Sequence, residues 1–174
     1  MSASVNLKSM ITDHPDFPRK GIIFRDFGPV LRDPQALLFV AREFGRLFDM
    51  DKIDVVAGIE SRGFVLSALL GARYGKGMVM IRKQGKIPGS TIRRSYQLEY
   101  GQGTLEIQEG AVSEGQAVLI CDDLLATGGT ARAAGELVRA AGGVVAGFAF
   151  IIELPGLGGA EAISGYEYRS LVQY

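Results

Sequence analysis

Short, almost uninterrupted apolar runs alternate with helix-like segments along most of this chain. The runs are DVVAGI (54–59), GMVMIR (77–82), VLIC (118–121) and VVAGFAFIIE (144–153). Strands that are apolar on both faces are typical of a parallel sheet covered by helices on each side. The sequence therefore predicts an α/β fold with a mostly parallel central sheet, whose ligands bind at the carboxyl ends of the strands.

The segments between these runs carry helix signals. Asp33 and Pro34 suit the cap and the first position of a helix that continues to about residue 48. Within it, apolar residues recur at helical spacing, at Leu37, Leu38, Ala41, Phe44, Leu47 and Phe48. Two further helices are predicted over 63–75 and 129–141; the first ends at Gly75 and the second is ended by Gly142 and Gly143.

Composition indicates one globular domain and disfavours two kinds of partner. The 174 residues are 47% hydrophobic and 22% charged, and no linker or repeat divides residues 1–174. Basic and acidic residues balance at 19 each. Bulk electrostatic binding to nucleic acid or to an anionic membrane needs a basic excess, so neither partner is expected.

The N-terminus lacks the basic and apolar regions of a signal peptide, and no apolar run reaches the ~18 residues of a membrane span, so a cytoplasmic location is expected. Cys121 is the only cysteine and is expected to be a buried strand residue rather than a reactive thiol. His14 is the only histidine, and the irregular PDFP segment after it predicts a loop position. Chemistry that depends on a histidine triad or a histidine-rich metal site is therefore disfavoured.

Two adjacent carboxylates and a loop of small residues follow the run at 118–121. Asp122 and Asp123 stand at the strand end, and ATGGT (126–130) leads into the next helix. Such a loop can bind phosphate through backbone N–H groups and the helix dipole, although TGGT alone fits an ordinary glycine turn with a threonine cap equally well. Neither common nucleotide-binding fingerprint is present. A ribose 5-phosphate offers hydroxyls to the carboxylates and a phosphate to the loop.

Residues 82–107 interrupt the strand–helix alternation. This segment is basic at its start and alternates in SYQLEY and TLEI, which predicts a hairpin closing through residues 101–103. An excursion this long within a compact domain is typical of a functional lid, although a solvated hairpin without a role is the alternative.

Several motifs in this order resemble the type I phosphoribosyltransferases. Their signature is an apolar strand, two acidic residues and a TGGT-type loop, here DDLLATGGTA. The motifs FPRKGIIFRDFGPVLRDP, GIESRGF, IRKQGKIPG and SYQLEYG extend the likeness over residues 17–131. Of these, GIIFRD, GIESRGF and SYQLEYG resemble the branch of the family that acts on adenine.

This resemblance implies a fold and a reaction. The fold is the family's central sheet with a small N-terminal hood over residues 1–33 and a flexible hairpin lid over residues 82–107. The reaction is the conversion of adenine and 5-phosphoribosyl 1-pyrophosphate (PRPP) to AMP and pyrophosphate. It requires Mg²⁺, which is expected to bind through the substrate without a direct protein ligand. The family is usually homodimeric.

The resemblance also implies roles for individual residues. Asp122 and Asp123 would hold the ribose hydroxyls. The 5-phosphate would bind to the loop residues Ala126, Thr127, Gly128, Gly129 and Thr130. Pyrophosphate would contact Glu60, Ser61, Arg62, Arg82, Lys83 and Lys86, with the Glu60–Ser61 peptide in the cis form. Cations at these positions suit a leaving group that carries several negative charges.

The base and its proton are assigned to two other segments. Phe24 would stack on adenine while backbone groups of Ile23 and Arg25 read its edge; a simple core role for Phe24 is the alternative. Glu99 would handle the purine proton beside the lid residue Tyr100. Strand alternation leaves a solvated position for Glu99 open.

Two other functions compete with this reading. A related enzyme acting on xanthine, hypoxanthine or guanine would share the acidic loop but not SYQLEYG. A regulator that keeps the site as a sensor would add a basic nucleic-acid-binding segment, which the balanced charge does not favour.

Overall fold

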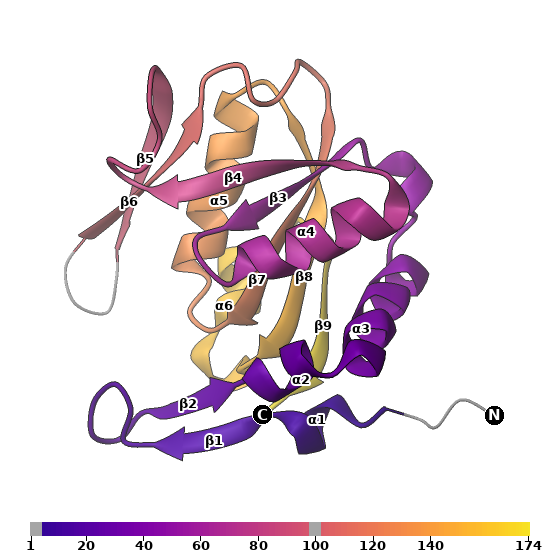
Figure 1. Ribbon diagram of the computed structural model, residues 1–174. Coiled ribbons are helices and arrows are strands. Elements are labelled where there is room, and N and C mark those ends of the chain that lie inside the picture. The colour runs from indigo at the N-terminus through magenta and orange to yellow at the C-terminus, as the bar shows by residue number, and fades with distance from the viewer. Residues whose placement is uncertain (1–4, 98–101) are drawn as a thin grey trace.

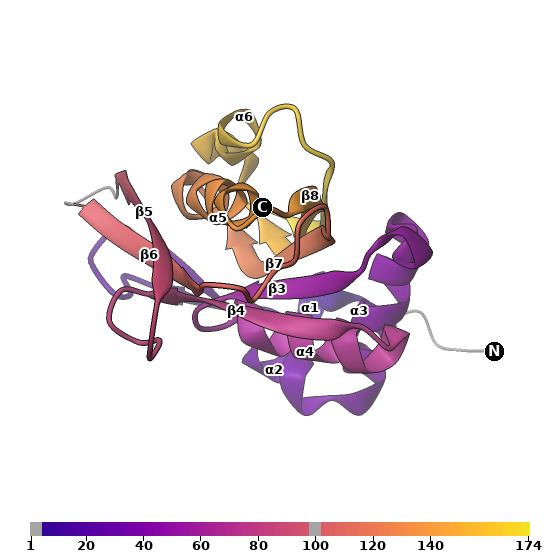
Figure 2. The ribbon, with the colours of Figure 1, turned by 90° about the horizontal axis from the view of Figure 1, so that it is seen from above.

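The computed structural model describes residues 5–97 and 102–174, which form one central sheet with helices on both faces (Figures 1 and 2). The sheet has seven strands in the order β5-β6-β4-β3-β7-β8-β9. Their bounds are β3 Val55–Ile59, β4 Gly77–Lys83, β5 Thr91–Gln97, β6 Gln102–Gln108, β7 Ala117–Leu125, β8 Val144–Glu153 and β9 Tyr168–Gln173. From β4 to β9 neighbouring strands are parallel, whereas β5 and β6 form an antiparallel hairpin on the edge of β4. The predicted α/β class is confirmed.

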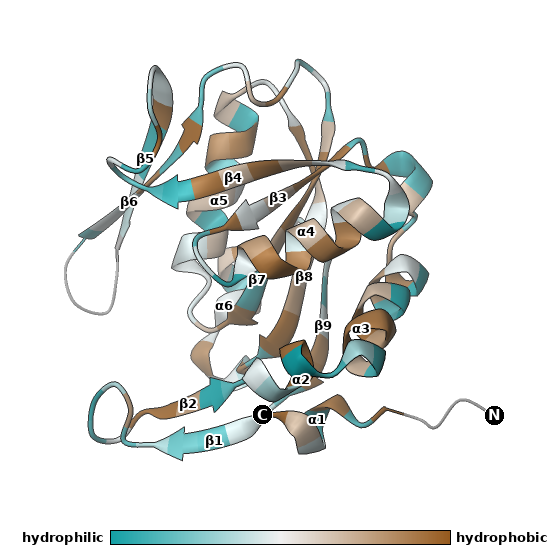
Figure 3. Cartoon of the chain, viewed as in Figure 1, coloured by the Kyte–Doolittle hydropathy of each residue, from teal (hydrophilic) through white to brown (hydrophobic). Residues whose placement is uncertain are grey.

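Helices cover the sheet in two layers. The helices are α1 Leu7–Met10, α2 Gly28–Arg32, α3 Pro34–Leu47, α4 Gly63–Tyr74, α5 Gly129–Ala140 and α6 Gly159–Ala162, with short 3₁₀ turns η1 Met50–Lys52 and η2 Pro155–Leu157. Figure 2 shows α4 on one face and α5 with α6 on the other. One buried cluster packs under α3 and α4, and a second packs under α5. Hydropathy in Figure 3 follows this plan, with β8 and α4 among the most hydrophobic elements.

The helix ends follow the sequence signals. The Asp33 carboxylate accepts the backbone N–H groups of Gln35 and Ala36, which caps α3 where the Asp-Pro pair predicts. Helix α4 ends at a left-handed Gly75, as predicted. Helix α5 has Gly128 as its cap residue and no side chain caps its first turn, which argues against the alternative of an ordinary threonine cap.

A separate two-stranded antiparallel ribbon, β1 Thr12–Pro15 and β2 Ile23–Asp26, lies beside the main sheet. The expected loop position of His14 is wrong, because His14 lies in β1 and pairs with Phe24. The strand is short and all its residues are exposed, so no burial pattern marks it in the sequence. In Figure 1 this ribbon and the β5–β6 hairpin lie on the same side of the molecule, toward which the arrows of β3 and β4 point.

Cys121 is fully buried in β7, as predicted, and burial raises the pKa of its thiol above the usual range. Within the described parts of the chain, no helix combines the length and apolar character needed to cross a membrane.

Candidate active site

Three parallel strands deliver the candidate residues to one edge of the sheet. Strands β3, β4 and β7 are adjacent and parallel, so their carboxyl ends face the same way. Residues 60–62 follow β3, residues 84–90 follow β4, and residues 126–128 follow β7. The separate motifs of the sequence therefore meet in space.

The acidic pair lies near the end of β7. Asp123 is 6% exposed, and its Oδ2 lies 3.0 Å from Nη2 of Arg62. Asp122 is half-buried, and its Oδ1 accepts the backbone N–H of Asp123 at 2.9 Å. Burial raises the pKa of Asp122 well above its usual range, the negative charge of Asp123 adds to this, and Arg62 partly opposes it. Two close carboxylates with one cation favour a ligand that brings hydroxyl donors or positive charge.

The loop after β7 brings free backbone donors toward these carboxylates. Gly128 has φ +78°, a left-handed conformation that leads directly into α5. A Cβ atom there would lie 2.6 Å from both the Cβ of Ala162 and the carbonyl oxygen of Gly159, so only glycine fits. Because no side chain caps the 12-residue helix, the N–H groups of its first turn can bind an anion. Thr127 is exposed, and Gly129 and Thr130 are half-buried.

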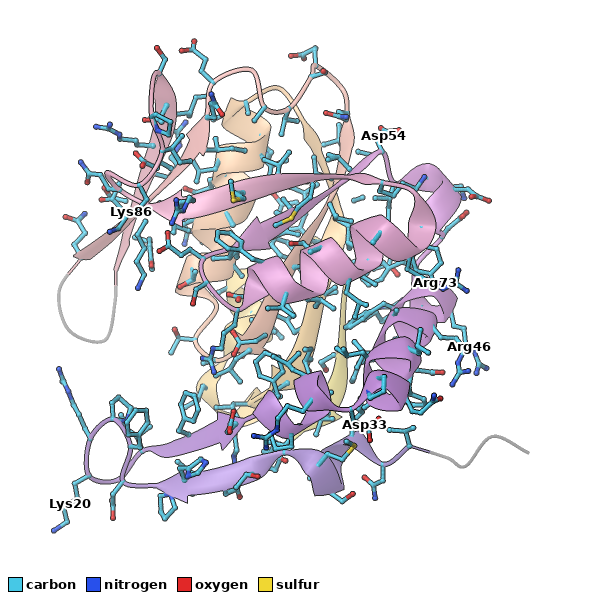
Figure 4. All side chains as sticks on the ribbon, viewed as in Figure 1. Lys20, Asp33, Arg46, Asp54, Arg73 and Lys86 are labelled. Atoms are coloured by element: carbon cyan, nitrogen blue, oxygen red, sulfur yellow. The ribbon has the colours of Figure 1, made fainter. Side chains whose placement is uncertain are left out.

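Glu60 organises the loops after β3 and β4. Its Oε2 accepts Nε of Arg82 at 3.2 Å and the backbone N–H of Lys83 at 3.0 Å. The Glu60–Ser61 peptide is cis, as the family resemblance implies. Arg82 also donates to the carbonyl of Lys86 at 2.9 Å. The side chains of Lys83 and Lys86 remain exposed, and Figure 4 shows Lys86 beside the hairpin.

Arg62 joins the acidic pair to the candidate base site. Its guanidinium carbon lies 4.9 Å from the centre of the Phe24 ring and 5.9 Å from that of Phe27. Phe24 is half-buried and belongs to neither core cluster, so its ring is available to a ligand. Together with Phe17 it borders a pocket of about 630 Å³ lined by the β1–β2 ribbon and its connecting loop, and the two rings meet edge to face with their centres 5.3 Å apart.

The neighbours of Phe24 differ in their surroundings. Ile23 is 48% exposed. Arg25 forms an ion pair with Asp13, and its guanidinium carbon lies 4.0 Å from the centre of the Tyr174 ring. The C-terminal residue Tyr174, just after β9, thus contacts the ribbon that carries Phe24, which the sequence does not indicate. Glu99 and Tyr100 lie outside the described residues.

Sequence reasoning missed a second carboxylate that supports the site, Glu106. It is fully buried in β6 between buried Leu105 and Ile107, whereas the alternation of TLEI predicts that it faces solvent. The loop after β4 covers this face of the hairpin, and only long-range structure reveals that cover. Its sequence neighbours offer no signal that could have found it.

No group of three or more His, Cys, Asp or Glu side chains gathers within residues 5–97 and 102–174 in a way that could hold a metal ion. Asp122 and Asp123 could still contribute to a cation that other groups also hold.

Comparison with known proteins agrees with this geometry. The family model described as phosphoribosyl transferase domain matches residues 30–171. Adenine phosphoribosyltransferase from Nitrosopumilus maritimus (strain SCM1) is 56% identical over 170 residues, covering 98% of this chain and 100% of that protein. The crystal structure of adenine phosphoribosyltransferase from Thermoanaerobacter pseudethanolicus superposes with a TM-score of 0.93 at 45% identity, covering 97% of this chain and 98% of that one. The Saccharomyces cerevisiae enzyme, complexed with D-2,5-dideoxy-2,5-imino-altritol 1,6-bisphosphate and adenine, gives 0.90 at 37% identity, covering 95% and 96%.

Proposed function

This chain belongs to the phosphoribosyltransferase family and, within it, to the adenine phosphoribosyltransferases, and on that premise we propose that it converts adenine and PRPP to AMP and pyrophosphate. One observation carries the proposal. The acidic pair Asp122 and Asp123 near the end of β7 and the uncapped start of α5 lie on either side of the loop at residues 126–128, at the carboxyl edge of the sheet. A sugar with two hydroxyls and a 5-phosphate fits that arrangement.

We propose that Asp122 and Asp123 accept the ribose hydroxyls of PRPP. The 5-phosphate binds the loop residues Ala126, Thr127, Gly128, Gly129 and Thr130, whose backbone donors and helix dipole favour an anion. The same carboxylates stabilise the positive charge that develops on the ribose ring as the bond to pyrophosphate breaks. Substrate binding thereby relieves the repulsion between the two carboxylates, which raises the pKa of Asp122 in the free protein.

The pyrophosphate group is assigned to the loops after β3 and β4. The candidate contacts are Glu60, Ser61, Arg62, Arg82, Lys83 and Lys86. Glu60 supports them through Arg82, whereas the exposed ammonium groups of Lys83 and Lys86 are free to approach the phosphates. Mg²⁺, when bound with the substrate, would supply positive charge that offsets the charge developing on the leaving group. We propose that the substrate itself would supply most of the ligands for the ion.

Adenine is placed against the ring of Phe24, with backbone groups of Ile23 and Arg25 at its edge. In the reaction a ring nitrogen of adenine forms the bond to the anomeric carbon of ribose while the bond from that carbon to pyrophosphate breaks. The proton of that nitrogen passes to Glu99. The lid, residues 82–107 with Tyr100 beside Glu99, excludes water from the reacting carbon. Residues 1–33 serve as the hood within a single domain of residues 1–174.

We further propose a homodimer. Met78 and Met80 of β4 pair with Val56 and Gly58 of β3, so their side chains share one face of the sheet. That face is the one covered by α4, because a Cβ added to Gly58 would meet Ser67 of α4. They are 37% and 50% exposed, beside α4. An exposed apolar face of this kind suits a second copy of the chain. Sedimentation velocity tests the homodimer: we expect wild type to sediment as a dimer and Met80→Glu to dissociate more readily. The buried free thiol of Cys121 is in keeping with a cytoplasmic location.

The activity is tested by measuring nucleotide formation with each purine base. We expect AMP from adenine, PRPP and Mg²⁺, and little product from hypoxanthine, guanine or xanthine. Glu99→Ala is expected to lower kcat by about 10²- to 10⁴-fold, the usual contribution of an acid/base residue. Glu109→Ala is the matched control, because Glu109 is exposed just after the hairpin and has no assigned role. Turnover of another base in preference to adenine would reassign the substrate, and full activity of Glu99→Ala would remove that residue from the mechanism.

A further inference from the structure

Glu106 is a fully buried carboxylate whose two oxygens are both occupied. Its Oε1 accepts the backbone N–H groups of Lys86 at 2.9 Å and Ile87 at 3.0 Å. Its Oε2 lies 3.3 Å from the hydroxyl of Thr91 and 3.2 Å from Nε of Arg93. The side chain thus contacts both the loop after β4 and the strand β5, from its own position on β6.

These partners keep Glu106 charged. Burial opposes ionisation, but the N–H groups of Ile87 and Lys86 and the Arg93 guanidinium outweigh it, so the pKa of Glu106 lies below its usual value. Movement of the loop N–H groups away from this buried carboxylate is costly, because each lost hydrogen bond leaves part of the charge unsatisfied.

The loop that Glu106 holds carries Lys86, and the opposite side of the same residue is also held. Glu106 binds the backbone N–H of Lys86, while Arg82 binds its carbonyl oxygen at 2.9 Å. Arg82 in turn binds Glu60, which precedes the cis peptide after β3. A continuous series of contacts therefore runs from the hairpin through Lys86 to the loop after β3.

Arg93 and Glu106 are directly opposite each other in the β5–β6 ladder. Glu99 belongs to the stretch of sequence between β5 and β6, residues 98–101, which lies outside the described residues. The base-binding ribbon meets this series at its far end, where Arg62 of the loop after β3 lies 4.9 Å from the centre of the Phe24 ring. The other ring and charge contacts described for Phe24 and Arg25 run to His14, Phe17, Asp13 and Tyr174, away from Glu106.

We propose that Glu106 is a positioning residue for the pyrophosphate site. Its carboxylate holds the backbone at Lys86 and Ile87 in the conformation that binds pyrophosphate, and it ties that loop to the lid hairpin. The proposal rests on the proposed function, because it takes the loop after β4 as the pyrophosphate contact. It adds a residue that touches no substrate and acts through backbone groups.

The main test compares Glu106→Ala and Glu106→Gln with wild type. Loss of hydrogen bonds to a charged group predicts at least about a tenfold rise in the KM for PRPP in Glu106→Ala, with the KM for adenine within about twofold. Glu106→Gln keeps one oxygen for the two loop N–H groups and is expected to recover most of that loss. A merely structural role would instead raise both KM values together or lower kcat alone.

Two measurements without turnover complete the test. Hydrogen exchange at the amides of Lys86 and Ile87 is expected to speed up in Glu106→Ala, and to a smaller degree in Glu106→Gln, while amides in α3 stay unchanged. Calorimetry with magnesium pyrophosphate is expected to show weaker binding in the same order. Wild type that binds no pyrophosphate would remove the proposed role of the loop. A folded Glu106→Ala that binds magnesium pyrophosphate as tightly as wild type would overturn the positioning role alone. If Glu106→Ala does not fold, the test rests on Glu106→Gln. Wild-type hydrogen exchange at Lys86 and Ile87 together with wild-type affinity for magnesium pyrophosphate in Glu106→Gln would then overturn the proposal.

Discussion

Gly63→Ala is expected to damage both stability and activity, because Gly63 marks the closest approach of α4 to β7. A Cβ atom at this position would lie 2.4 Å from the carbonyl oxygen of Cys121 and 3.1 Å from Oδ1 of Asp122. Cys121 pairs with β3 on one side and with β8 on the other, so its backbone cannot give way. The start of α4 must therefore move back by about 1 Å to reach an ordinary contact distance.

The size of both effects follows from this displacement. Overpacking of this kind costs about 2 kcal/mol of the free energy of unfolding, which lowers Tm by about 4 to 8 °C in a chain of this length. Arg62 immediately precedes Gly63 and pairs with Asp123 at 3.0 Å. Moving it by about 1 Å is expected to lower kcat/KM by roughly 100-fold, since reacting groups tolerate little misplacement.

Urea denaturation and steady-state kinetics on the same protein samples measure the two effects. Gly77→Ala is the matched control, because its added Cβ would meet only Cγ2 of Val55, at 3.7 Å. We expect that control to stay close to wild type in both measurements. Wild-type stability and activity in Gly63→Ala would refute the reasoning, and a stable variant with full activity loss would show that only the site, and not the packing, depends on Gly63.

Three further predictions concern the acidic pair and the base site. Burial and the charge of Asp123 raise the pKa of Asp122 above 3.8, so the folded state holds the carboxyl proton of Asp122 more tightly than the unfolded chain does. The contribution of Asp122 to stability is therefore greatest below about pH 3.8 and is lost as pH rises through the raised pKa. Asp122→Asn should make the free energy of unfolding, measured by urea titration between about pH 4 and pH 8, less dependent on pH. It should stabilise the protein at neutral pH while weakening PRPP binding. A pH dependence equal to that of wild type would contradict the prediction. Phe24→Leu should raise the KM for adenine about tenfold and leave that for PRPP unchanged, because the stacking ring is lost. Tyr174→Leu removes the ring under Arg25 and should raise the KM for adenine severalfold, whereas Tyr174→Phe keeps the ring and should behave as wild type.

Local patterns in the sequence predict the interior of this fold well. Helices α3, α4 and α5 begin where predicted and end within one residue of the prediction, since caps and glycines mark those ends. Strand β7 is longer than its apolar run, because pairing with β8 continues to Leu125 opposite Glu153. Strands β1, β2 and β9 carry no comparable signal. Their residues are largely polar or exposed, and tertiary pairing alone makes them strands.

The candidate site divides in the same way. Motifs that follow a buried strand, such as the acidic pair, can be placed from sequence because parallel strand ends meet at one edge. The contacts between these motifs cannot be predicted from the sequence. The ion pair of Arg62 with Asp123, the position of Arg25 against Tyr174 and the burial of Glu106 join segments that are far apart in the chain. No pattern of period two or 3.6 reports such pairings.

The β1–β2 ribbon has its own two-stranded sheet and lies beside the large one. The sites proposed for the base and for the activated sugar therefore lie in different parts of the architecture, and Arg62 contacts both. An exchange of residues 12–26 for the equivalent stretch of a relative could alter the choice of purine while the sheet edge and its phosphate loop stay intact. If the ribbon holds the base as proposed, a new choice of purine requires the redesign of this small ribbon rather than of the enzyme's core.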